Sequence, residues 1–296
     1  MIACICLQER PDRFALSQAE FHRTGLCGDV FYFRPTKQPL EHVNALGFQR
    51  ADAFGSWESH RHVASRALSV GAFDRATQSG AVPAMLVFED DVMFVRPVTR
   101  STVARLLRQI ARLPPDWDML LLGHIPFPVP GFSRPLDLIT DWQIWRVRSL
   151  MLHAYVLSER GARKLAAAPY QRFSPTYGLT KPDEHFLDLW LQHNAVQYAV
   201  VPMLCGQADT PSDQNSMGGK QSGIRLHTRL VKHAPYLLET TLMVLPLVTL
   251  LVLAIATVLF LLYCLRPSSI LSSPTHTTAQ PKTAEPLQSS VHVHVH

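Results

Sequence analysis

Three consecutive acidic residues, Glu89, Asp90 and Asp91, follow the apolar run AMLVF at positions 84–88. Such a run is typical of a buried strand, and in open α/β sheets ligands bind at the carboxyl ends of the strands. Alternation along an extended chain would direct Glu89 and Asp91 to one face and Asp90 to the other. Massed carboxylates attract a hard divalent cation, magnesium or manganese, which diphosphate oxygens can share. The triplet therefore predicts a metal site held by all three acids, and a solvated acidic turn is the alternative.

Arg13, Ser59 and His60 are further candidates for a binding site. Arg13 can pair with a phosphate or lie solvated on the first helix. Ser59 is expected to cap the helix that follows it, which is compatible with a place for His60 near a nucleotide. His60 and His62 are two positions apart and do not share a helix face, so we do not predict a metal site built on this histidine pair.

Motifs of several other enzyme classes are missing from the sequence. There is no GxGxxG after a strand, no GxxxxGK followed by Ser or Thr, no GxSxG and no HExxH, so dinucleotide, P-loop, serine-hydrolase and zincin chemistry are not indicated. The formal charge of +5 is modest, and no basic run is interleaved with aromatic residues, so we expect no nucleic-acid partner. Five cysteines without a CxxC pair fit a reducing compartment.

Short apolar runs alternate with helical patterns in the part of the chain that must position these residues. Six runs are expected to be strands: 2–7, 30–33, 84–88, 119–122, 154–157 and 196–201. The segment 102–113 has one apolar face and one arginine-bearing face, and Ser158 is expected to cap a later helix. Strands separated by helices predict an α/β fold with a mostly parallel sheet covered on both sides.

Six segments, taken in order, resemble glycosyltransferase family 25, which includes bacterial lipopolysaccharide galactosyltransferases and the procollagen galactosyltransferases. Their order along the chain matches that of the family, although the family's usual Asn-Leu in the first strand is Cys6-Leu7 here. The segments are ICLQERPDRF at 5–14, GSWESH at 55–60, LVFEDDV at 86–92, DWDMLLLG at 116–123, HAYVLSERGARKL at 153–165 and PDEHFLDLWL at 182–191.

The resemblance implies a GT-A-like fold, a single α/β domain that binds a nucleotide sugar and a divalent metal at the strand ends. It implies transfer of galactose or glucose from a UDP-sugar donor to a glycan or protein hydroxyl. Manganese held by the acid triplet would neutralise the charge that grows on the departing UDP. The residues expected to contact the donor are Arg13, Ser59, His60 and Glu89.

The same resemblance places an acid beside the acceptor at a late helix start. Asp183, or Glu184 if the register shifts by one, would then accept the proton of the acceptor hydroxyl. The competing interpretation makes Asp183 an N-cap, which satisfies free backbone N–H groups and has no catalytic duty.

Two other functions stay open. A metal-dependent phosphotransferase or nucleotidyltransferase would also place acids at a strand end, but a second acidic pair for a two-metal site is not evident. A noncatalytic, membrane-tethered sugar-binding or interaction protein of the same fold is the other alternative, and the complete acid triplet argues against it.

The segment from Thr240 to Leu265 carries no charge, and about 20 apolar residues suffice to cross a membrane. We expect a single transmembrane helix there, joined by a basic linker at 220–239 to a catalytic domain at 1–219. Residues 266–296, rich in Pro, Ser and Thr, are expected to be disordered. More basic residues precede the span than follow it, which predicts a cytosol-facing catalytic domain, with a lumenal domain as the family-based alternative.

Overall fold

The computed structural model describes residues 1–26, 30–48, 50–95, 98–124, 134–138, 144–149, 151–170, 187–201, 203–208 and 235–264. The chain divides into two compact units, Met1–Thr249 and Leu250–His296. The first unit contains the sheets and all the residues discussed below as a site.

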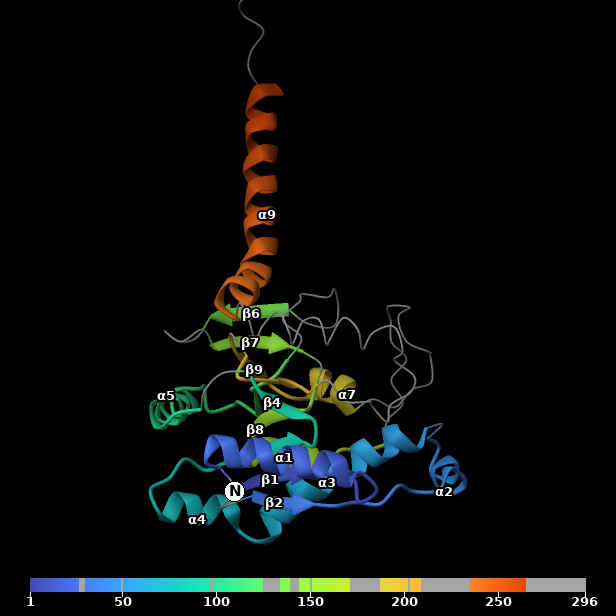
Figure 1. Ribbon diagram of the computed structural model, residues 1–296. Coiled ribbons are helices and arrows are strands. Elements are labelled where there is room, and N and C mark those ends of the chain that lie inside the picture. The colour runs from blue at the N-terminus through green and yellow to red at the C-terminus, as the bar shows by residue number, and fades with distance from the viewer. Residues whose placement is uncertain are drawn as a thin grey trace, which may run out of the picture. The chain divides into compact units, whose positions relative to one another are not determined.

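The described strands of the first unit form an eight-stranded sheet and a two-stranded sheet (Figure 1). The order of the large sheet is β2 (Val30–Phe33), β1 (Ile2–Ile5), β3 (Ala84–Glu89), β8 (Ala154–Ser158), β5 (Met119–Leu121), β9 (Gln197–Val200), β7 (Ile144–Arg148) and β6 (Arg134–Leu138). The small sheet pairs β10 (Cys205–Gln207) with β4 (Val92–Phe94).

Strand direction is mixed in the large sheet. β1 is parallel to β2 and β3, and β5 is parallel to β9. β8 runs antiparallel to both of its neighbours, β3 and β5, and β7 runs antiparallel to β9 and β6. The predicted α/β class and all six predicted strands are confirmed. The parallel arrangement holds at β2-β1-β3, where the acid triplet lies, and it is broken by β8 and by the added β7-β6 pair.

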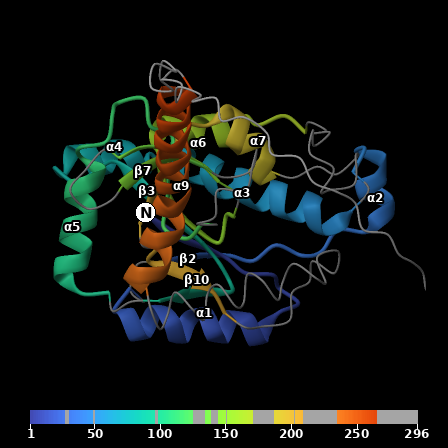
Figure 2. The same ribbon diagram turned by 90° about the horizontal axis from the view of Figure 1, so that it is seen from above.

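Helices cover both faces of this sheet, as the alternation of side chains on β1 shows. Ala3 and Ile5 belong to one apolar cluster, together with α3 (Ala51–Ser69), α4 (Ala72–Gln78), α6 (Glu159–Ala166) and α7 (Leu187–Asn194). Cys4 and Cys6 belong to the other, with α1 (Pro11–Thr24) and α5 (Arg100–Ile110). Figure 2 shows α1 on the opposite side of the strands from α3 and α6. A short helix, α2 (Leu40–Ala45), precedes α3.

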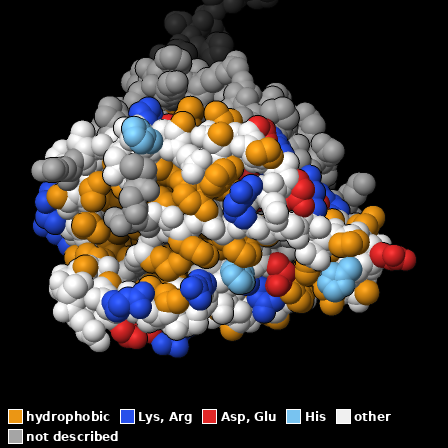
Figure 3. Space-filling model, turned by 60° about the horizontal axis from the view of Figure 1, so that its bottom comes forward, with side chains coloured by type: hydrophobic (Ala, Val, Ile, Leu, Met, Phe, Trp, Pro, Cys, Tyr) orange, Lys and Arg blue, Asp and Glu red, His pale blue; other side chains and the backbone are white. Residues whose placement is uncertain are grey.

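The face drawn in Figure 3 carries Lys, Arg, Asp, Glu and His side chains interspersed among hydrophobic ones. Charges of both signs lie near one another there, so that face presents no extended field of a single sign.

The predicted cap at Ser158 is confirmed, and it yields a stability prediction. The hydroxyl of Ser158 accepts a hydrogen bond from the Gly161 N–H at 3.0 Å and donates one to the Trp117 carbonyl at 2.8 Å. We expect Ser158→Ala to lower the free energy of unfolding by about 1 to 2 kcal/mol, because it leaves both backbone groups without this partner. Urea denaturation measures the loss. Ser79→Ala, an exposed serine at the end of α4, is the control and should change stability by less than about 0.5 kcal/mol; equal losses would contradict the cap.

The prediction of a membrane-spanning helix at Thr240–Leu265 is corrected by the structure. That part of the chain belongs to α9 (Pro235–Cys264), so the end of the predicted linker is already helical. Among the residues whose side chains are described, no helix is long and apolar enough to cross a membrane. The cytosol-facing orientation depended on that span and is corrected with it; the predicted tail at 266–296 lies outside the described residues.

Candidate functional site

The first three strands open a crevice at their carboxyl ends. The chain leaves β1 toward α1 on one face of the sheet, and it leaves β2 toward α2 and α3 on the other. Where neighbouring parallel strands continue to opposite faces, their loops separate, and ligands of open α/β sheets bind in the crevice that results. The strand order β2-β1-β3 also brings the end of β3, with the acid triplet, to the edge of this crevice.

A cavity of about 730 Å³ lies at these strand ends. Its volume falls within the range of roughly 300 to 1,000 Å³ that is usual for small-molecule sites. It brings together six residues that the sequence singled out: Arg13, Ser59, His60, Glu89, Asp90 and Asp91. The two acids proposed for the acceptor proton, Asp183 and Glu184, lie outside the described residues.

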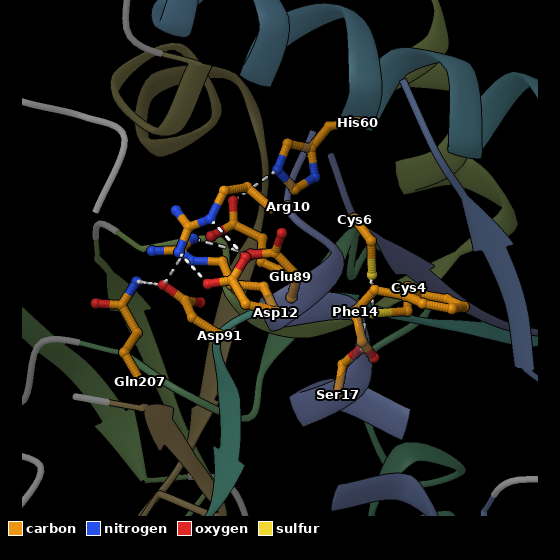
Figure 4. A network of polar contacts seen from close by, with 12 residues as sticks. Cys4, Cys6, Arg10, Asp12, Phe14, Ser17, His60, Glu89, Asp91 and Gln207 are labelled. Carbon is orange, nitrogen blue, oxygen red and sulfur yellow. Dashed lines mark hydrogen bonds and ion pairs between the residues drawn. The ribbon is translucent and has the colours of Figure 1, made fainter. Parts of the chain in front are cut away.

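Glu89, the last residue of β3, is held by α3. The His60 Nε2 atom lies 3.0 Å from Glu89 Oε1, and the His60 Nδ1 atom lies 2.7 Å from the Tyr155 hydroxyl on β8. Figure 4 shows the His60 ring directed at the Glu89 carboxylate. Burial raises the pKa of Glu89, but the hydrogen bond with His60, together with the nearby charge of Arg13, outweighs that effect and lowers the pKa below its ordinary value. Glu89 is therefore an ionised carboxylate on the cavity wall.

Asp90 is paired with Arg13, 77 residues away in the sequence. The Arg13 Nη1 atom donates to Asp90 Oδ1 at 2.9 Å, and both side chains are more than nine-tenths buried. Burial raises the pKa of Asp90 despite the opposing charge of Arg13. Arg13 is thus not solvated on the first helix, because its guanidinium joins the start of α1 to the end of β3.

Asp91 is the least satisfied of the three acids. Its Oδ1 atom is buried without a hydrogen-bond partner. Its Oδ2 atom accepts a long contact of 3.4 Å from the Gln207 amide on β10, and Arg13 Nη1 is 3.9 Å away. Burial, followed by the charge of Glu89, raises the pKa of Asp91 to about 7.

The expected alternation of the three acids holds only in part. Glu89 contacts α3 and Asp90 contacts α1, on opposite faces of the sheet as predicted. Asp91 was expected beside Glu89, but it faces Arg13 of α1 and Gln207 of β10. The reason is that β3 ends at Glu89 and the chain turns at the next two residues, so the period of two no longer applies.

Ser59 does not cap a helix. It lies in the middle of α3, which begins at Ala51, and its hydroxyl donates to the Gly55 carbonyl one turn earlier at 2.6 Å. Such a bond uses the donor of the serine hydroxyl within its own helix and leaves its oxygen able to accept. Ser59 nevertheless lines the cavity, one residue before His60, so the predicted place for both residues near a bound ligand is compatible with the structure.

The acids fit a divalent cation at one carboxylate rather than at three. Within the described ranges, no three His, Cys, Asp or Glu side chains are grouped so as to hold a metal ion. Glu89 and Asp90 already have close partners, whereas Asp91 offers a buried oxygen without one. Magnesium and manganese are often held by one or two carboxylates together with substrate phosphates, and Asp91 satisfies that minimum.

Sequence reasoning missed several residues of the cavity and its surroundings. Lys37, Arg50, Asp52 and Gln207 line it, the first three from the loop after β2 and the start of α3. No motif marks these residues. Their only signal is position, since the loop that follows the second parallel strand must border the crevice.

Asp188, next to the start of α7, was also missed by sequence reasoning. Its Oδ1 atom accepts a hydrogen bond from the Leu189 N–H at 3.0 Å. Burial raises its pKa, and hydrogen bonds from the Leu189 and Met151 N–H groups oppose that effect. It follows Asp183 and Glu184 closely in the sequence, so the described part of this segment also carries a buried acid.

Comparison with known proteins adds little to this geometry. No family model matches the chain. Among solved structures, the chain is similar to the crystal structure of A197 from STIV, with 10% sequence identity, a TM-score of 0.31, and coverage of 69% of this chain and 83% of that one. A likeness at that TM-score carries no argument about function, so the functional argument depends on the site itself.

Proposed function

We propose that this protein is a metal-dependent glycosyltransferase of the GT-A type that moves a hexose from a UDP-sugar to a hydroxyl of a glycan or protein. The observation that carries the proposal is the cavity at the ends of β1, β2 and β3. It gathers residues from five separate segments, and they include every described residue that the family resemblance implies for donor and metal binding.

The charge around the cavity suits a diphosphate only if a cation accompanies it. Three cationic side chains, Arg13, Lys37 and Arg50, line the cavity beside four carboxylates, those of Asp52 and the acid triplet. Arg50 is paired with Asp52, and Arg13 with Asp90. A diphosphate would add negative charge to a set that already has one more carboxylate than cationic side chains, so its binding requires a further positive charge. We propose that a divalent metal, manganese or magnesium, supplies it at Asp91.

The residues of the chain have separate tasks under this proposal. Asp91 would hold the metal, which when bound acts as a Lewis acid on the diphosphate leaving group. Arg13 keeps the Asp90 carboxylate paired beside it, and His60 keeps Glu89 oriented at the cavity wall. The proton of the acceptor hydroxyl is proposed to pass to Asp183, with Glu184 as the substitute.

The test is release of UDP from UDP-galactose or UDP-glucose by the purified full-length chain. With manganese and a mixture of candidate acceptors, we expect release that stops when a strong chelator is added and returns with fresh manganese. The acceptor-free reaction is the control, because slow hydrolysis of the donor does not demonstrate transfer. Full release in the presence of chelator would contradict the metal-dependent mechanism.

A second candidate is a noncatalytic protein that binds a nucleotide sugar in the same cavity. It is favoured by the internal pairing of Glu89 with His60 and of Asp90 with Arg13, which leaves Asp91 as the carboxylate with an unpartnered buried oxygen. Calorimetry distinguishes the two: binding of UDP with manganese but no release from any donor supports the binding protein. A protein that neither binds UDP nor releases it from any donor contradicts both.

A further inference from the structure

A buried chain of polar contacts ends on the Glu89 carboxylate. The Tyr155 side chain on β8 and the His60 side chain on α3 are almost completely buried, and neither Tyr155 nor the strand around it lines the cavity. The Tyr155 hydroxyl is 2.7 Å from His60 Nδ1, and His60 Nε2 is 3.0 Å from Glu89 Oε1. Only Glu89 reaches the cavity with a substantially exposed side chain, of which 28% is accessible.

The direction of the hydrogen bonds follows from the tyrosine. Burial raises the pKa of Tyr155 well above its ordinary value, so the phenol keeps its proton. A buried O–H group needs an acceptor, and His60 Nδ1 is in place to serve as one. Nδ1 then carries no proton, and the single ring proton of a neutral His60 lies on Nε2. Nε2–H is therefore the donor to Glu89, which is the direction that an ionised carboxylate requires.

We propose that Tyr155 and His60 are positioning residues. Tyr155 fixes the tautomer of His60, and His60 holds one oxygen of the Glu89 carboxylate so that the other oxygen faces the bound substrate. This inference rests on the proposed function of the cavity. The two residues act through Glu89: Tyr155 does not line the cavity, and the His60 side chain, although it borders the cavity, is only 1% exposed. Their burial makes the arrangement rigid, because both side chains pack in the core between β8 and α3.

Two substitutions, His60→Gln and His60→Asn, distinguish a role in holding Glu89 from a role in core packing. The side-chain amide of Gln is long enough to place an N–H near the position of Nε2, so His60→Gln can still donate to Glu89. The shorter amide of Asn reaches only the position of Nδ1, so His60→Asn can meet Tyr155 but not Glu89. Both variants remove the ring and leave similar space. A role in packing alone predicts that Asn and Gln have similar effects, whereas positioning predicts that Gln retains activity and Asn does not.

The kinetic arm measures sugar transfer by the full chain with UDP-galactose and manganese. We expect His60→Asn to lower kcat about 100-fold and Tyr155→Phe about 10-fold, since a small misplacement of a positioned group costs about that much. His60→Gln should stay within about 10-fold of the wild type. Tyr198→Phe is the matched control, because Tyr198 is also buried but lies on β9, two strands from β8. Equal loss in the Gln and Asn variants, or a loss in Tyr198→Phe as large as in Tyr155→Phe, overturns the proposal.

The spectroscopic arm does not depend on activity. Long-range proton–nitrogen NMR of the wild-type protein, with His60 assigned by its disappearance in His60→Gln, should show a protonated Nε2 and an unprotonated Nδ1. The Nδ1 signal should move in Tyr155→Phe, which lacks the donor, and should not move in Tyr198→Phe. A proton on Nδ1 in the wild type overturns the proposal even if the enzyme is active. If the NMR spectra show the predicted tautomer but the protein transfers no sugar, the proposed function is contradicted. The proposed hydrogen bonds from Tyr155 to His60 and from His60 to Glu89 then still hold.

Discussion

Asp91→Asn is expected to abolish metal-dependent sugar transfer and, at the same time, to make the metal-free protein more stable above pH 7. The loss of activity should reach about 1,000-fold or more, because the leaving diphosphate would develop its charge without the cation that Asp91 holds. The gain in stability comes from the environment of the carboxyl group. Its Oδ1 atom is buried without a partner, and it lies close to the negative charges of Glu89 and Asp90.

The pH window of the stability effect follows from the pKa of Asp91, which is raised from its ordinary value of 3.8 to about 7 in the folded protein. Between these values the unfolded chain has lost the proton and the native protein still holds it, so the wild type loses stability as the pH rises from about 4 to about 7. Each tenfold difference in proton affinity corresponds to about 1.4 kcal/mol, which makes the total penalty on the order of a few kcal/mol. Asn carries no proton to lose, so the excess stability of Asp91→Asn over the wild type should grow from about pH 4 to about pH 7 and stay constant above pH 7.

Urea denaturation of the metal-free wild type and Asp91→Asn at pH 5 and pH 8 measures this difference. Manganese should stabilise the wild type at pH 8 and leave the variant unchanged, because only the wild type binds it. Asp12→Asn is the control: Asp12 is fully exposed, and the hydrogen bond from Arg10 lowers its pKa to about 2, so its neutralisation should not stabilise the protein. Normal sugar transfer by Asp91→Asn would exclude the metal role, and a variant that is less stable than the wild type at pH 8 would contradict the cost assigned to the buried carboxylate.

The strands were predictable from sequence because each is a short apolar run that the core buries, and β2 and β8 match their predicted ranges to within one residue. Their direction was not. An apolar run has the same composition whichever way it points, so nothing in residues 154–157 distinguished the antiparallel β8 from a parallel strand. Four strands were not predicted: β4 and β10, which have three residues each, and β6 and β7, which have five.

The candidate site was predictable where chemistry and strand ends coincide, as at Glu89, Asp90 and Asp91. The pairing of Arg13 with Asp90 was not, because it joins residues 77 positions apart and depends on the fold that brings α1 to the end of β3. The predicted cap at Ser59 was wrong for a local reason. The N-cap of α3 is Arg50, whose side chain makes no capping hydrogen bond, so the sequence has no capping signal at the true helix start and a serine in the helix interior takes its place.

Asp118 is predicted to have the largest effect on stability outside the cavity. It opens the segment DMLLLG at 118–123. In the structure it is completely buried, away from the cavity lining. Its Oδ2 atom accepts hydrogen bonds from Lys164 Nζ at 2.6 Å and from the Val196 N–H at 2.8 Å. The carboxylate therefore joins the start of β5 to α6 and to the residue that precedes β9.

We expect Asp118→Ala to lower the free energy of unfolding by about 3 kcal/mol. Loss of one partner of a buried ion pair typically costs about 3 to 5 kcal/mol, and the lower end applies because Lys164 is partly exposed and can turn to water. The Val196 N–H also loses its acceptor in this variant. Asp118→Asn keeps an acceptor oxygen for that N–H and loses the charge, so its cost should be intermediate.

Urea denaturation of the three proteins tests this order, and Asp116→Ala provides the comparison. Asp116 is two residues earlier, exposed, and contributes its backbone carbonyl rather than its carboxylate to the contact with Arg160. Its truncation should change stability by less than about 0.5 kcal/mol. Because Asp118 does not line the cavity, kcat of any Asp118 variant that remains folded at the assay temperature should equal that of the wild type. A folded Asp118→Asn protein with greatly reduced kcat would show that Asp118 has a role in the site. A loss of unfolding free energy in Asp118→Ala no larger than in Asp116→Ala would show that the buried pair contributes nothing to the stability of the fold.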